Sequence, residues 1–182
     1  PGASHINHMP SHTWNEMGLW EEAVRANTIA WHSDQKAAIG RGVAIYPTHN
    51  LTMLYYAAAM GGESAAAIQA AKDLAKLNNN TAMHAMALVR FGRFDEVLDI
   101  DQAPNGEINI TMYEFSRAYA NLKSNDIEKA RQTLESLKEQ TKTSTARFRF
   151  HDGKDIIGTL AGILEGELAW TQGNMEAAAE SF

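Results

Sequence analysis

Cysteine is absent from this 182-residue chain, which excludes disulfide bonds and thiolate metal ligands. Its absence leaves the compartment open, because many periplasmic proteins also lack cysteine. No apolar run approaches the roughly 18 residues that a membrane-spanning helix needs. Basic residues are outnumbered by acidic ones, 16 to 22, and the resulting net charge of −6 argues against a nucleic-acid partner.

Familiar catalytic motifs are also missing. The chain has no phosphate-binding loop, nucleotide-binding glycine fingerprint, nucleophile elbow or His-Glu-x-x-His. Its carboxylates, such as Glu21, Glu22, Asp95 and Glu96, have the spacing of solvated helix faces. The sequence therefore favours a role other than catalysis, without excluding an enzyme. With 45% hydrophobic and 21% charged residues, it has the composition of a soluble globular domain.

Five short segments share one pattern. Each has a Gly or Asn that tolerates a left-handed turn, in most copies a large or apolar residue two positions on, and a small residue five positions on. The turn residues are Gly18, Gly62, Gly92, Asn125 and Gly173, at intervals of 44, 30, 33 and 48 residues. Apolar residues with helical spacing precede each turn. The repeated unit is therefore predicted to be a helical hairpin.

This pattern resembles the tetratricopeptide repeat family, whose helix pairs recur about every 34 residues. The resemblance implies an all-α, right-handed solenoid of about five antiparallel helix hairpins in a single domain. The expected repeats are 4–37, 48–77, 78–110, 111–144 and 159–182, with insertions at 38–47 and 145–158. An alternating pattern in the second insertion favours a short hairpin or a loop there. Because the chain starts without Met and stops inside an expected helix, we expect a piece of a longer protein.

Two segments resemble a narrower group of bacterial tetratricopeptide proteins. They read His-x-x-His-Met-Pro-Ser-His at 5–12 and Tyr-Pro-x-His-Asn-Leu at 46–51. In that group a further His often follows the Leu, where this chain has Thr52. The signature implies no particular activity.

The repeat register assigns residues to the concave groove. In the family, groove-facing side chains lie about 13, 10, 6 and 3 residues before each turn. The residues predicted to line a ligand groove are His5, His8, His12, Asn15, His49, Thr52, Tyr56, Asn79, Met86 and Tyr119. A protein or peptide in this groove is the leading functional expectation, and no cofactor is then required.

A metal site is the alternative expectation. His5, His8 and His12 are three and four residues apart, so a helix would place them on one face, with His49 on the neighbouring helix. Imidazole nitrogens suit zinc, copper or nickel, and such an ion could support hydrolysis. Asn15, Glu16 and Asn50 could orient the rings or a bound water.

The position of Pro10 leaves the local backbone open. Proline favours the first turn of a helix, so the helix is predicted to start near Pro10, with His5 and His8 on a preceding turn or loop. The same histidines would equally serve as hydrogen-bonding surface for a peptide. Among the other histidines, His32 and His84 fit surface and packing roles, and His151 lies in the second insertion.

Overall fold

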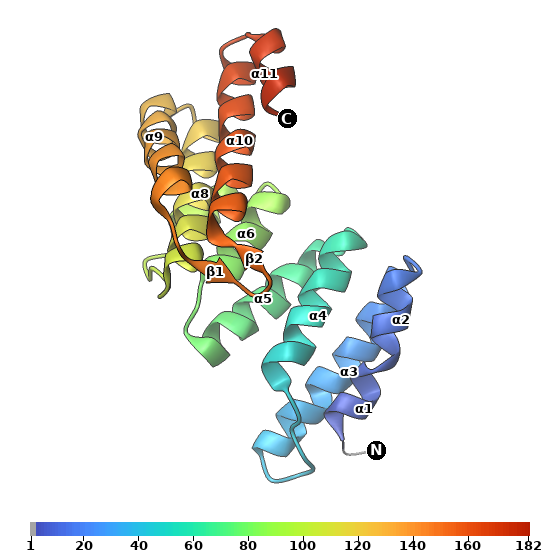
Figure 1. Ribbon diagram of the computed structural model, residues 1–182. Coiled ribbons are helices and arrows are strands. Elements are labelled where there is room, and N and C mark those ends of the chain that lie inside the picture. Colours follow the sequence, from blue (N-terminus) through green and yellow to red (C-terminus); the bar gives the residue numbers. More distant parts are fainter. Residues whose placement is uncertain (1–2) are drawn as a thin grey trace. The chain divides into compact units, whose positions relative to one another are not determined.

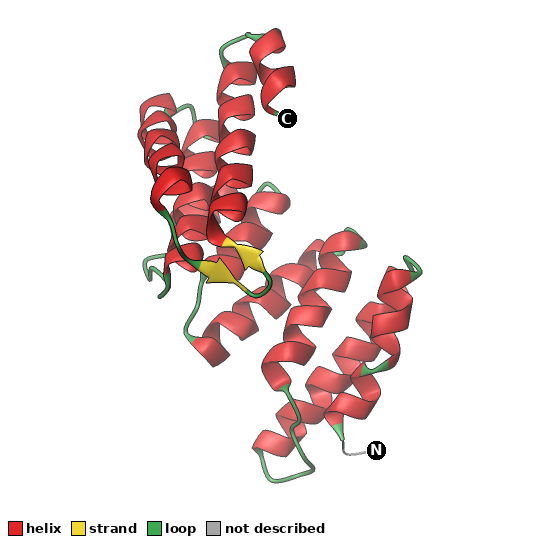
Figure 2. Ribbon diagram, in the orientation of Figure 1, coloured by secondary structure: helices red, strands yellow, loops and turns green. Residues whose placement is uncertain are grey.

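The structure is a computed structural model that describes residues 3–182, and these are mostly helical (Figure 2). The high helix content confirms the predicted all-α fold class. None of the helices within 3–182 combines the length and apolar character needed to cross a bilayer. The chain forms two compact units, Pro1–Asn79 and Asn80–Phe182.

The first unit begins with two short helices, α1 (Ser4–His8) and α2 (Pro10–Glu16). Three longer helices follow: α3 (Trp20–Ala38), α4 (Pro47–Met60) and α5 (Ser64–Asn78). Helix α3 packs against α1, α2 and α4, and α4 packs against α5 (Figure 1). The expected insertion at 38–47 corresponds to the connection between α3 and α4.

The second unit contains α6 (Ala82–Arg90), α7 (Phe94–Leu98), α8 (Glu107–Lys123) and α9 (Ile127–Thr143). A two-stranded hairpin of β1 (Arg147–Phe148) and β2 (His151–Asp152) leads into α10 (Gly153–Thr171) and α11 (Met175–Ser181). The apolar core of the second unit lies among α8, α9 and α10, around the buried residues Leu137, Ile157 and Leu164.

All five predicted turns have the left-handed backbone that their residues favour. The φ angles are 72° at Gly18, 77° at Gly62, 69° at Gly92, 66° at Asn125 and 78° at Gly173. A helix begins two residues after each turn, at α3, α5, α7, α9 and α11. The residue five positions after each turn is buried, as Ala23, Ala67, Val97, Ala130 and Ala178 show. The position predicted for a small residue at a close helix contact is therefore buried in every copy.

Two parts of the second unit differ from the expected repeat boundaries. Helix α10 starts at Gly153, inside the segment 145–158 that was expected to be an insertion, and the predicted short hairpin is confined to β1 and β2. Helix α7 is only five residues long. The chain after it, residues 99–106, contains Pro104 and Gly106, which do not favour helix.

Candidate metal centre

Helices α1 and α2 place His8 and His12 on the same side of the helix pair. Met9, which joins the two helices, keeps helical backbone angles of −50° and −41°, and its N–H donates to the His5 carbonyl at 3.1 Å. Pro10 occupies the first turn of α2, where a missing N–H is tolerated. The helical direction therefore carries through the proline, and His5 and His8 lie on a short helix rather than on a loop.

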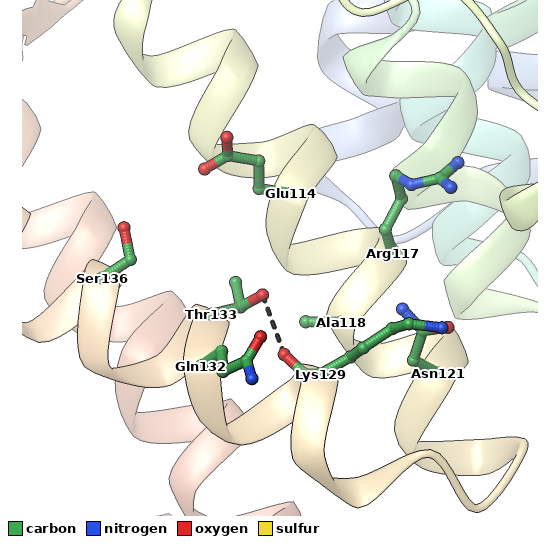
Figure 3. Close-up of a pocket in the computed structure, with 8 residues that line it drawn as sticks. All are labelled: Glu114, Arg117, Ala118, Asn121, Lys129, Gln132, Thr133 and Ser136. Carbon is green, nitrogen blue, oxygen red and sulfur yellow. Dashed lines mark hydrogen bonds between the residues drawn. The ribbon is translucent and has the colours of Figure 1, made fainter.

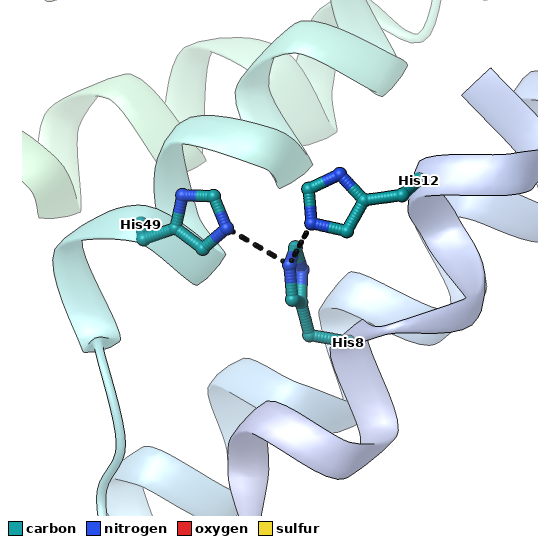
Figure 4. A group of neighbouring side chains, drawn as sticks. All are labelled: His8, His12 and His49. Carbon is teal, nitrogen blue, oxygen red and sulfur yellow. Dashed lines mark hydrogen bonds between the residues drawn. The ribbon is translucent and has the colours of Figure 1, made fainter. Parts of the chain in front are cut away.

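Three histidines converge across two neighbouring parts of the first unit. The His8 Nε2 atom lies 2.9 Å from His12 Nε2 and 3.0 Å from His49 Nε2 (Figure 4). The ligand atoms of the three rings all lie within 4.8 Å of one another. Within residues 3–182, this is the one group of three or more His, Asp or Glu side chains with such spacing. We call it the histidine cluster.

Asn27 of α3 fixes the orientation of the central ring. Its Nδ2 donates to the Ala23 carbonyl at 2.9 Å, which leaves Oδ1 as the atom that faces His8 Nδ1 at 2.7 Å. Ser11 also donates to Asn27 Oδ1 at 3.3 Å. This network assigns the ring proton of neutral His8 to Nδ1, because Oδ1 can only accept. The unprotonated Nε2 of His8 then faces His12 and His49.

Burial favours the neutral form of His8. The side chain is fully buried, and this burial lowers the pKa of the imidazole below its usual value of 6.5. The neighbouring His12 and His5 lower the pKa further, while the hydrogen bond to Asn27 and the charge of Asp34 act in the opposite direction. A neutral imidazole is the form that binds a metal ion.

Exposure changes steadily across the histidine cluster. His8 is fully buried, His49 is partly buried and His12 is exposed. An ion held by the three nitrogens would therefore have protein behind it and solvent near His12. Sites of this kind keep a coordination position for water or another ligand, unlike closed structural sites.

His5 lies beside the cluster. Its ring stacks on His8 with centroids 5.4 Å apart, and the Tyr46 ring meets it edge-on at 5.2 Å. His5 Nδ1 is buried and has no hydrogen-bond partner. Tyr46 has an uncommon left-handed backbone, with φ 58°, just before Pro47 at the start of α4. The role of His5 as a fourth ligand stays a prediction.

The other groove residues predicted in the first unit have different surroundings. Asn15 is 8% exposed, and neither of its side-chain polar atoms has a hydrogen-bond partner. The Thr52 hydroxyl donates to the Thr48 carbonyl of its own helix at 2.7 Å. Tyr56 is 44% exposed and packs edge-on against Trp20. Of these three, Tyr56 offers the most accessible apolar surface.

The remaining groove predictions fall at the end of α5 and in the second unit. Asn79 ends α5 with a left-handed backbone, φ 53°. Met86 and Tyr119 pack against the core of the second unit, and the Tyr119 hydroxyl donates to Glu167 Oε1 at 2.9 Å. Both side chains are only partly buried, and their place in a ligand groove stays a prediction.

A polar pocket of about 350 Å³ lies between α8 and α9 in the second unit (Figure 3). Arg117 at its edge already donates to the carbonyls of Leu98 at 3.1 Å and Ile100 at 3.3 Å. The Thr133 hydroxyl donates to the Lys129 carbonyl at 3.1 Å. Arg117 and Thr133 thus have hydrogen-bond partners within the unit, and none of the eight lining residues is a histidine.

Sequence reasoning missed Asn27 as the partner of His8. The available signal was an amide on the buried face of α3, where Ala23, Asn27 and Ala30 are spaced by four and three residues.

When compared with models of known protein families, with curated proteins and with solved structures, the chain matches none of them.

Proposed function

We propose that the first unit binds a transition-metal ion through the Nε2 atoms of His8, His12 and His49. The supporting observation is that His8 Nε2, with one lone pair, faces two further ring nitrogens at 2.9 and 3.0 Å. A single lone pair accepts one well-aligned hydrogen bond, whereas a cation accepts electron pairs from all three rings. Tetrahedral zinc with Zn–N bonds of about 2.05 Å requires nitrogens about 3.3 Å apart. The two separations from His8 lie within about 0.4 Å of this value, and the ligand atoms of all three rings lie within 4.8 Å of one another.

The ligand chemistry favours zinc, copper or nickel. All three donors are imidazoles, which suit these ions better than magnesium or calcium. Asn27 holds His8 in the tautomer that a metal ligand requires, as outer-shell partners commonly do. The exposed side near His12 leaves room for a further ligand such as water.

Metal titration of the full chain tests this proposal. We expect one Zn²⁺ per chain by elemental analysis and calorimetry, and a loss of affinity of about 100-fold or more in His12→Ala. His12 is exposed, so its removal is expected to leave the fold intact. His32→Ala is the matched control, because His32 is an exposed histidine outside the cluster. A chain that cannot be loaded with zinc, copper or nickel would contradict the proposal.

We also infer that the helix hairpins form a tetratricopeptide-like solenoid. Support comes from the left-handed backbone at all five turns and from the buried residue five positions after each one. This inference concerns the repeat architecture and is independent of the metal proposal.

A peptide- or protein-binding role is a second proposal, favoured by apolar exposure on α4. Tyr56 and Met60 are 44% and 46% exposed and lie one helical turn apart. We expect Tyr56→Ala to weaken capture of a specific partner while helix content is retained, as measured by pull-down and circular dichroism. Unchanged capture of every partner would contradict this role for Tyr56.

A further inference from the structure

A buried carboxylate lies on the same face of α3 as Asn27. Asp34 follows Asn27 by seven residues, which is two helical turns, and its exposed fraction is 3%. The face of α3 that packs against α1, α2 and α4 thus carries two polar side chains. Asn27 contacts His8, and Asp34 lies two helical turns further along α3.

Asp34 is joined to the residue after His49. Asn50 Nδ2 donates to Asp34 Oδ2 at 2.9 Å and to the Ile45 carbonyl at 3.1 Å. The second carboxylate oxygen, Oδ1, is buried and has no hydrogen-bond partner. One neutral amide therefore provides the polar contact to this side chain.

No cation balances this carboxylate within the described chain. None of the salt bridges among residues 3–182 includes Asp34. A buried and unpaired carboxylate is costly, and such groups usually have a cation or a metal ion nearby. The charge of Asp34 also acts on His8, whose pKa it raises against the larger effect of burial. Asp34 therefore acts on His8, the central residue of the cluster, and its hydrogen-bond partner Asn50 directly follows His49 in α4.

We propose that Asp34 is the counter-charge of the histidine cluster and makes the site select divalent over monovalent metal ions. This inference rests on the proposed metal-binding function. Three neutral imidazoles bring no charge to the ion, whereas the buried carboxylate of Asp34 is the negative charge that acts on His8. Coulomb attraction is proportional to the charge of the ion, and Asp34 attracts a dication twice as strongly as a monocation. Asp34 acts through this field and is a positioning residue rather than a ligand.

The substitution Asp34→Asn tests the role of the charge, because it preserves size and keeps an oxygen that can accept from Asn50. Affinities for Zn²⁺ and Cu⁺ are measured on the full chain by competition with chromophoric chelators. We expect Zn²⁺ affinity to fall by about 100-fold, the upper end for outer-shell residues, and Cu⁺ affinity by about tenfold. The ratio follows from the charges, since the logarithm of the loss for Zn²⁺ is twice that for Cu⁺.

A second readout uses the protein without metal. Because Asp34→Asn removes an unbalanced buried charge, we expect its melting temperature without metal to equal or exceed that of the native chain. A merely structural role predicts a lower melting temperature and unchanged metal affinities. Asp101→Asn is the control, because it changes the net charge equally at an exposed position outside the first unit.

The outcomes distinguish a failure of the metal-binding function from a failure of the counter-charge role of Asp34. If the native chain binds none of zinc, copper and nickel, the metal-binding function itself fails. If the native chain binds Zn²⁺ but Asp34→Asn weakens both ions equally or neither, the counter-charge role is overturned. Should Asp34→Asn not fold, Asp34→Ser removes the charge with a smaller side chain and is titrated in the same way. If neither variant folds, Asp34 is needed for structure and the proposal is overturned.

Discussion

At the scale of single residues, the orientation of one imidazole decides what the histidine cluster can bind. Asn27 Oδ1 accepts a hydrogen bond from the Nδ1–H group of His8 at 2.7 Å. The Nε2 atom of His8 therefore directs its lone pair at His12 and His49. Without this partner, either nitrogen of His8 could carry the proton. The amide therefore fixes the tautomer of His8, the central ring of the cluster.

Asn27→Leu tests this orientation. The variant keeps a similar volume but leaves the Ser11 hydroxyl, 3.3 Å away, as the remaining polar contact of His8 Nδ1. This contact fixes the ring less firmly than Asn27 at 2.7 Å, so we expect metal affinity to fall by about 10–100-fold. The free energy of unfolding without metal should fall by about 1–3 kcal/mol. Calorimetric metal titration and urea unfolding measure the two effects. Asn109→Leu, which removes an amide bonded to the Asn105 carbonyl in the second unit, should leave metal affinity unchanged.

The positions of the histidines were predictable from the sequence, whereas their supports were not. A spacing of four residues places His8 and His12 on one helical face, and the turn at Gly62 places His49 on the adjacent helix. Asn27 and Asp34 gave a weaker signal, since polar residues in helices are usually solvated. Their burial depends on which face of α3 packs inward, and that face is set by the packing of α1, α2 and α4 against α3.

At the scale of secondary-structure elements, two glycines of α10 have opposite roles. A Cβ at Gly153 would lie 2.7 Å from the Ala146 carbonyl oxygen and 2.8 Å from Ile108 Cδ1. A Cβ at Gly158 would meet Thr141 Cγ2 at 3.5 Å, an ordinary van der Waals contact. Gly153 is therefore required by the close approach of the chain that enters α10, while Gly158 is not required by packing.

Alanine substitutions distinguish these two glycines. We expect Gly153→Ala to lower the free energy of unfolding by about 1–3 kcal/mol, because backbone atoms must move. Gly158→Ala should raise it by up to about 1 kcal/mol through higher helix propensity. Chemical denaturation of both variants measures the difference. Equal effects of the two substitutions would show that the contact at Gly153 is readily relieved.

Tyr119 connects α8 with α10 and gives the second unit a dependence on alkaline pH. Burial raises the pKa of its hydroxyl above the usual 10.0, and Glu167 adds to the shift by hydrogen bonding and by its charge. Above pH 10.0 the unfolded chain loses this proton while the folded chain retains it. The folded state then binds more protons, so stability falls as the pH rises.

Tyr119→Phe should reduce this alkaline loss of stability. We expect the variant to be less stable than the native chain near neutral pH, because Glu167 loses its hydroxyl donor. Its free energy of unfolding should decline less steeply above pH 10.0. Denaturant unfolding at a series of pH values provides the comparison. Parallel pH profiles for both proteins would exclude Tyr119 as the titrating group.

At the scale of the whole molecule, the repeat pattern was the most predictable feature. Gly and Asn adopt left-handed backbone readily, so the five turns could be located from residue type alone. The start of α10 was harder to predict, because Gly153 and Gly158 weaken the helical signal and the alternating residues 147–152 suggested a longer insertion. The division into two compact units gives no local signal, since it depends on packing between distant residues.

The division into two units predicts a local effect of the proposed metal binding. All three proposed ligands belong to the first unit, so we expect Zn²⁺ to slow amide hydrogen exchange in α1, α2 and α4. Residues of α8, α9 and α10 should exchange at unchanged rates. Exchange measured by mass spectrometry with and without Zn²⁺ tests this expectation, with His12→Ala as the control that should not respond. Slower exchange throughout the second unit would contradict it.

The gradient of exposure across the histidine cluster also bears on how quickly a bound ion would exchange. An ion leaves a multidentate site by releasing one ligand at a time, and the ligand that moves most easily goes first. His12 is exposed while His8 is enclosed, so departure should begin at His12 and end at His8. The residence time of the ion would then depend on the motion of one surface side chain. Such a site could pass its metal to a competing chelator without unfolding.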